Sequence, residues 1–241
     1  MEWATNPDIW ISLITLTALE IILGIDNIVV ISILAGKLPK NQQPKARFVG
    51  ISLALVTRLL LLLSIVWLAG LTAPLFSLLG RAISIRDLIM IGGGLFLLVK
   101  GTHEIHCVFE TPEDKIKEGA GRTFSVIIFQ IVMMDIVFSL DSVITAVGMA
   151  QHIGVMVAAV VIAVFIMLVA SGTISSFIHK HQSLKMLALS FLLMVGVTLI
   201  AEGLAFHIPK GYIYFAMGFS GTVETLNILA GSRKKAVTAV Q

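Results

Sequence analysis

Apolar stretches about as long as a bilayer is thick are the feature that most limits how this chain can fold. A helix that crosses a membrane needs about 20 mainly apolar residues. Seven such stretches cover residues 10–35, 48–70, 84–101, 124–149, 154–178, 184–205 and 211–229. The 241 residues are 57% hydrophobic and 13% charged, whereas soluble domains are about 25% charged. We therefore expect an all-α membrane protein with seven transmembrane helices in a lipid bilayer.

The distribution of lysine and arginine predicts the orientation of these helices, because cytoplasmic loops carry an excess of both residues. With seven spans, three of the 17 basic residues (Arg81, Arg86 and Lys210) fall on the side of the N-terminus, and thirteen fall on the other side. The first ten residues lack the basic region of a cleavable signal peptide. We expect a multi-pass membrane protein with the N-terminus outside and the C-terminus in the cytoplasm.

Composition also argues against several classes of function. The formal net charge is +3, and no basic stripe interleaves with aromatic residues, so nucleic acid is not an expected partner. Cys107 is the single cysteine, which excludes an intrachain disulfide. No constellation of nucleophile and base is recognisable, so we expect neither an enzyme nor a resident cofactor. Protein partners are left open by the sequence.

Two short acidic motifs suggest an internal repeat. EIILGIDN (20–27) aligns with DIVFSLDS (135–142), and GGLFLLVKG (93–101) aligns with VGVTLIAEG (195–203). The matched polar positions are Glu20 with Asp135, Asp26 with Asp141, and Asn27 with Ser142. A repeat of three spans must invert in the membrane, and inverted repeats are typical of secondary transporters with a site near the midplane.

We therefore expect one transmembrane domain over residues 1–241, divided into two inverted repeats and one additional helix. The predicted parts are repeat one at about 10–101, a cytoplasmic loop at about 102–122, repeat two at about 123–205, and the extra C-terminal helix at about 211–229.

Carboxylates within the predicted spans indicate a site for a cation or for protons. A charged side chain at the bilayer centre costs about 2.5–3.5 kcal/mol on insertion scales, and Arg58 is the one base clearly within a span. One arginine cannot neutralise the four acids of the two motifs. Oxygen ligands suit Mg²⁺, Ca²⁺ or Mn²⁺. The predicted metal ligands are Glu20, Asp26, Asn27, Asp135, Asp141 and Ser142.

Other interpretations of the acids remain open. Buried carboxyl groups can stay protonated and join helices through hydrogen bonds. Glu202 lies near the outer end of the sixth span, where a wetted interfacial acid is expected. Glu224 in the seventh span is a proton carrier, a partner of Arg58 or a helix-joining group. Arg58, Glu224 and Glu202 are therefore secondary candidates for a proton or charge relay.

The spacing within the first motif predicts a distorted helix. Six residues turn an ideal helix by about 600°, so Glu20 and Asp26 lie about 120° apart. Either they face different neighbours or the helix is kinked or broken, and we expect the break at Gly24. HEIHC (103–107) is interpreted as a polar juxtamembrane stretch, with a metal-collecting vestibule as the alternative. The glycines at 92–94 predict close helix packing, with a gating hinge as the alternative.

EIILGIDNIVVISILAGKLP and MMDIVFSLDSVITAVGMA closely resemble the two signature helices of the TerC family of integral membrane proteins. The resemblance extends to RLLLLLSIVWL, GGGLFLLVKGTHEIH and KGYIYFAMGFSGTVETLNIL, which together cover much of the chain. It implies a seven-span inner-membrane protein that is similar in its repeat plan to LysE-like exporters. Some family members are linked to manganese(II) efflux, and the family is linked in name to tellurium resistance.

Three functions follow from these observations. The first is an exporter of a divalent metal cation, with Mn²⁺ favoured, that exchanges the ion for protons at the motif acids. The second is a proton-coupled exporter of a small organic solute such as a basic amino acid. The third is a membrane stress-complex subunit that does not transport. The sequence itself does not choose among Mn²⁺, Ca²⁺ and Mg²⁺, since all three prefer oxygen.

Overall fold

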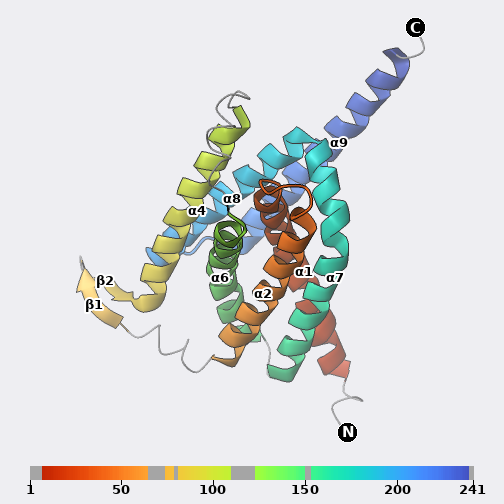
Figure 1. Ribbon diagram of the computed structural model, residues 1–241. Helices are drawn as coiled ribbons and strands as arrows, with labels where there is room; N and C mark the ends of the chain where they lie inside the picture. Colours follow the sequence, from red (N-terminus) through yellow and green to blue (C-terminus); the bar gives the residue numbers. More distant parts are fainter. Residues whose placement is uncertain (1–6, 65–73, 79–80, 110–122, 150–152, 239–241) are drawn as a thin grey trace.

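The chain is a helical bundle with one small hairpin. The computed structural model describes residues 7–64, 74–78, 81–109, 123–149 and 153–238, which form seven helices and two strands (Figure 1). The helices are α1 (Pro7–Ala35), α2 (Gln43–Leu63), α4 (Ile85–Phe109), α6 (Phe124–Met149), α7 (Ile153–Lys180), α8 (Gln182–Gly203) and α9 (Lys210–Thr238). The strands β1 (Pro74–Leu78) and β2 (Arg81–Ser84) pair antiparallel. The prediction of a seven-helix, all-α membrane protein is confirmed.

The length and the surface of the helices suit a lipid environment. Within the described residues, α1, α2, α4, α7 and α8 are long and apolar enough to cross a membrane, and Phe124–Ser139 of α6 is a shorter apolar segment. Large apolar side chains such as Phe129, Phe165 and Val169 are at least 65% exposed on the outside of the bundle. A soluble monomer rarely exposes so much apolar surface, whereas lipid accommodates it.

The helices pack in pairs that combine distant parts of the sequence. α1 packs mainly on α7, α4 packs on α8, and α2 packs on both α6 and α7. The apolar core lies among these helices, with Leu34, Leu97 and Ile131 at most 1% exposed. In Figure 1, α9 passes behind the other helices and its C-terminal end projects beyond them. Each half of the sequence thus supplies one member of every main pair.

Two glycines let α4 and α8 cross at backbone contact. A Cβ added to Gly94 would lie 2.6 Å from the carbonyl oxygen of Gly196, and a Cβ added to Gly196 would lie 3.0 Å from the carbonyl oxygen of Gly94. The flanking contacts form equivalent pairs: adding 102 to the α4 residue and subtracting 102 from the α8 residue of one contact gives another contact. They join Gly94 to Ile200, Leu98 to Gly196, Gly101 to Leu193, and Ile91 to Gly203. These pairs also make the two helices antiparallel.

The structure corrects the expectation for Gly24. α1 is continuous from Pro7 to Ala35, so a break at this residue is wrong, whereas a kink there stays a prediction. A Cβ at Gly24 would lie 2.4 Å from Sδ of Met167 on α7. The glycine therefore serves the close approach of two helices, and it does not interrupt the helix that contains it.

Several helix boundaries also differ from the sequence-based ones; α9, for example, ends at Thr238 and not at residue 229. Residues 102–109, assigned to the cytoplasmic loop, continue α4. Residues 74–78 and 81–83, which lie between the second and third predicted spans, belong to the strands β1 and β2, and β2 leads directly into α4. Ser84 and Asp87 cap this helix reciprocally: Oδ2 of Asp87 accepts from the Ser84 backbone N–H at 2.9 Å, and Oγ of Ser84 accepts from the Asp87 N–H at 3.3 Å. Residues 65–70 of the second predicted span lie outside the described residues.

Candidate functional site

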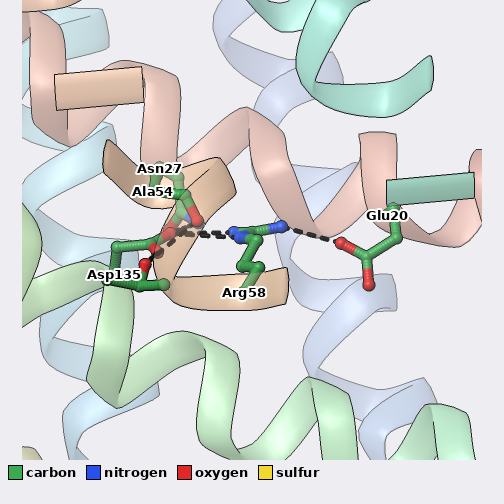
Figure 2. Close-up of polar contacts among 6 residues, drawn as sticks. Glu20, Asn27, Ala54, Arg58 and Asp135 are labelled. Carbon is green, nitrogen blue, oxygen red and sulfur yellow. Dashed lines mark hydrogen bonds and ion pairs between the residues drawn. The ribbon is translucent and has the colours of Figure 1, made fainter. Parts of the chain in front are cut away.

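An arginine bridges two acids from the two motifs in the interior of the bundle. Nη1 of Arg58 on α2 donates to Oε2 of Glu20 on α1 at 2.7 Å. Nε and Nη2 of Arg58 donate to Oδ1 of Asp135 on α6 at 3.2 and 3.1 Å. Figure 2 shows the guanidinium between the two carboxylates. All three residues are at most 5% exposed, so their charges compensate one another away from solvent.

Asp135 has two further partners. Nδ2 of Asn27 donates to its Oδ1 at 3.2 Å, and Oγ1 of Thr57 donates to its Oδ2 at 2.9 Å. The Thr57 hydroxyl also lies 3.0 Å from the carbonyl oxygen of Ala54. Asp135 thus receives hydrogen bonds from α1 and from α2 while it stays 2% exposed. A carboxylate that is this fully bonded has its negative charge well compensated.

Helix periodicity explains why these side chains meet. Glu20 and Asn27 are seven residues apart, which is about two turns, so they share one face of α1. Thr57 and Arg58 are adjacent in the C-terminal part of α2, and both reach Asp135. If both acids are ionised, the group of Glu20, Asp135 and Arg58 carries one net negative charge. We call Glu20, Asn27, Thr57, Arg58 and Asp135 the central cluster.

A small pocket adjoins the central cluster between α1 and α6. Its polar lining comes from Asn27 and Asp135, and its apolar lining comes from Val30, Ile31, Ile131, Met134 and Phe138. The cavity volume of this pocket is about 10 Å³, which is room for about one water molecule. The space next to the acids therefore suits a single small group.

The structure unites four of the nine predicted site residues. Glu20, Asn27, Asp135 and Arg58 lie together, whereas the side chains of Asp26, Asp141 and Ser142 lie outside the described part of the molecule. In that described part, the ion pairs of Arg58 go to Glu20 and Asp135, and Glu224 is not among its partners. Glu202 on α8 and Glu224 on α9 are half-buried.

No group of three His, Cys, Asp or Glu side chains placed to hold a metal ion occurs among the side chains described. The expected oxygen cluster remains a prediction, because half of the motif acids are not covered by this statement.

Thr57 was missed by the sequence analysis, and so was a second buried ion pair. Nζ of Lys37, just after α1, bonds to Oε1 of Glu104 near the end of α4. Glu104 belongs to HEIHC, yet it is 2% exposed. His103 faces the surface with Cys107, and its Nε2 lies 3.8 Å from that sulfur atom. HEIHC is therefore one turn of α4 with a buried acid.

A further polar contact joins the start of α2 to the end of α7. Nη1 of Arg47 lies 3.4 Å from Oγ of Ser175, and Nδ1 of His179 lies 2.7 Å from the carbonyl oxygen of Ser175. The ring of His179 also covers Gly36, where a Cβ would lie 2.6 Å from Nε2. A polar contact thus joins α2 to α7, and the packing of His179 on Gly36 joins α7 to the end of α1, on the side of the molecule that holds Lys37.

Comparisons with known proteins agree with this architecture. The family model described as "Integral membrane protein TerC family" matches residues 5–239. A UPF0053 protein of Haemophilus influenzae is 53% identical over 228 residues, which are 94% of this chain and 96% of that protein. The inner membrane protein YgdQ of Escherichia coli is 51% identical over 231 residues, which are 96% of this chain and 97% of that protein.

A longer relative contains the same region. The inner membrane protein YoaE of Escherichia coli is 53% identical over 231 residues, which are 95% of this chain but 45% of YoaE. No solved structure matches the chain. The extent of the family match and of these identities shows that this chain belongs to the TerC family of integral membrane proteins.

Proposed function

We propose that this protein is a transporter of the inner membrane that exports a divalent metal cation, with Mn²⁺ favoured, in exchange for protons. The observation that carries the proposal is the central cluster. Glu20 and Asp135 occupy matched positions in the two acidic motifs, and both are buried on one shared base. Buried ionisable groups within membrane helices mark ion and proton pathways.

The packing of α4 on α8 supports two inverted repeats. The contacts around Gly94 and Gly196 exchange partners at the offset of 102 residues that aligns GGLFLLVKG with VGVTLIAEG. The α1–α7 pair likewise corresponds to the α6–α2 pair when the two halves of the chain are exchanged. In transporters of this plan, the substrate site lies between the repeats, and the central cluster joins α1 and α2 of the first half of the chain to α6 of the second half.

The chemistry of the cluster favours a small, hard cation. The carboxyl groups of Glu20 and Asp135 supply oxygen ligands, and the mainly apolar pocket beside Asn27 and Asp135 has room for about one water molecule. With both acids ionised the cluster carries one net negative charge, and the predicted contribution of Asp26 and Asp141 would raise this to three. A divalent cation with oxygen ligands compensates such a charge, and protonation of the acids can replace the ion when it leaves.

One observation favours a second substrate class, a basic organic solute. The guanidinium of Arg58 already occupies the space between Glu20 and Asp135, so the two acids are arranged to bind a planar organic cation. In that case a basic amino acid, and not a metal ion, would replace Arg58 during transport.

The test uses cells and purified protein. Asp26→Ala and Asp141→Ala are introduced singly, with Asp8→Ala, an acid in the first turn of α1 outside the motifs, as the matched control. We expect both motif variants to lower manganese tolerance and raise cellular manganese at normal protein levels. Unchanged tolerance and content in both variants contradict the metal proposal.

Transport by the purified protein separates the two substrate classes. Proteoliposomes are assayed for Mn²⁺, Ca²⁺ and Mg²⁺ flux with and without a pH gradient, and for arginine flux under the same conditions. We expect Mn²⁺ flux that depends on the pH gradient. Arginine flux without metal flux would establish the organic solute instead.

A further inference from the structure

The two matched acids of the central cluster hold Arg58 unequally. Oδ1 of Asp135 accepts from Nε and Nη2 of Arg58 and from Asn27, and its Oδ2 accepts from Thr57. Glu20 accepts one bond, from Nη1 of Arg58 to its Oε2. Within the described part of the chain, four donors thus serve Asp135 and one serves Glu20. The sequence repeat gives no reason to expect this difference.

The unequal bonding follows the arrangement of the helices. Arg58 and Thr57 are neighbours on α2, and α2 packs directly on α6, which carries Asp135. Three of the four bonds to Asp135 therefore lie within one helix pair. Glu20 belongs to α1, whose main partner is α7. The bond between Glu20 and Arg58 thus crosses between the two pairs, and a small separation of α1 from α2 breaks it without disturbing Arg58 on Asp135.

We propose that Asp135 is the permanent ion-pair partner of Arg58, whereas Glu20 is an exchangeable partner. At Glu20, Nη1 of Arg58 occupies the position that the transported cation takes. The assignment of Asp135 and Glu20 stands on the geometry alone, and the part that concerns the cation rests on the proposed function. Arg58 is then a positioning residue that keeps Glu20 neutralised until a cation or a proton replaces it.

Competition within the molecule has a measurable consequence. A cation binds Glu20 only in the fraction of molecules in which Nη1 has withdrawn, and the apparent affinity is reduced by that fraction. If the withdrawn state is about 10% populated or less, removing the competitor tightens apparent binding by about tenfold or more. Lysine at residue 58 keeps one positive charge but is a compact group without the fork of arginine, so it can stay on Asp135 and release Glu20.

The first test compares two isosteric neutral variants of the purified protein, Glu20→Gln and Asp135→Asn. Asp135→Asn removes the charge that holds Arg58 at two nitrogen atoms, whereas Glu20→Gln leaves the ion pair between Arg58 and Asp135 intact. We expect the melting temperature to fall further in Asp135→Asn, by about 5 °C or more, and failure to recover only this variant counts as the same result. Equal losses, including failure to recover either variant, or a larger loss in Glu20→Gln, overturn the assignment.

The second test titrates MnCl₂ into wild-type protein, Arg58→Lys and Arg58→Lys/Glu20→Gln, with the shift in melting temperature as readout. We expect about tenfold tighter apparent binding in Arg58→Lys and no gain in the double variant. An equal gain in the double variant overturns the role of Glu20. If Mn²⁺ affects none of the three proteins, the proposed metal and the competition at Glu20 both fail. The melting temperatures of Glu20→Gln and Asp135→Asn in the first test then still decide whether Asp135 is the permanent partner of Arg58.

Discussion

The crossing of α4 and α8 gives the sharpest test of the packing, because the chain supplies its own control. Gly92, Gly93 and Gly94 follow one another in α4, but their surroundings differ. A Cβ at Gly92 would meet nothing within 4 Å, whereas a Cβ at Gly94 would lie 2.6 Å from the carbonyl oxygen of Gly196. That oxygen is part of the α8 backbone and cannot turn away. Gly94→Ala must therefore push the two helices apart, and Gly92→Ala need not.

The magnitude follows from two opposing terms. Alanine is favoured over glycine within a helix by about 0.8–1.0 kcal/mol, and this gain is the same at both positions. Overpacking of a tight contact costs about 1–3 kcal/mol, and it applies to Gly94→Ala alone. We expect Gly92→Ala to be neutral or slightly stabilising, and Gly94→Ala to be less stable than Gly92→Ala by about 1–3 kcal/mol.

Thermal melting of the detergent-purified variants measures this difference. For a chain of this size about 1 kcal/mol corresponds to about 2–4 °C, so the two melting temperatures should differ by about 2–12 °C. Gly196→Ala should behave like Gly94→Ala, since its Cβ would lie 3.0 Å from the Gly94 carbonyl oxygen. Equal stability of Gly92→Ala and Gly94→Ala would refute close packing and would favour a hinge at these glycines.

Three further substitutions test individual contacts by the same melting assay. Lys37→Met should destabilise the protein by about 3–5 kcal/mol, because it leaves the carboxylate of Glu104 buried without a counter-charge. The double variant Lys37→Met/Glu104→Gln should recover most of this loss, and a double variant no more stable than Lys37→Met would speak against the pair. Thr57→Val should cost about 1.5–3 kcal/mol through the lost hydrogen bond to a charged group, and an unchanged melting temperature would be incompatible with that bond. Gly24→Ala should displace the side chain of Met167, so it should cost less stability in a Met167→Ala background than in the wild type, and an equal cost in both backgrounds would place the strain elsewhere.

Much of the fold could be predicted because the membrane limits the choices. Apolar stretches of sufficient length must become helices when no water is present to satisfy the backbone, and within the described residues each of the seven stretches contains a helix. The membrane also makes polar residues conspicuous, which is why Glu20, Asn27, Arg58 and Asp135 were identified from the sequence. Their type and their depth in the predicted spans were enough to single them out.

The pairing of these residues could not be predicted, because it depends on how each helix is rotated. A count of charges sets Arg58 against four acids, but it says nothing about which acids α2 faces. The two acids of the first motif, Glu20 and Asp26, lie about 120° apart, whereas the shared face of α1 joins Glu20 to Asn27. Thr57 had no signal beyond its position next to Arg58.

The burial of Glu104 could have been inferred from helical spacing, but the polar residues around it favoured a loop. Gly101, Glu104, Ile105 and Val108 follow the spacing of one helix face, so the inward stripe of α4 continues into HEIHC. The histidines at 103 and 106 made this stretch resemble a loop. Burial of Glu104 also requires Lys37, which is 67 residues away in the sequence. A contact at that separation is not visible in local patterns.

The contact of Gly94 with Gly196 also has a consequence for the evolution of the chain. The backbone of each glycine occupies the space that a Cβ on the other glycine would need, so a larger residue at either position requires the two helices to move apart. If a relative carries a larger residue at one position, its α4 and α8 must be spaced further apart, and selection for glycine at the second position is then relaxed. The two residues should therefore vary together among homologous chains, although 102 residues separate them.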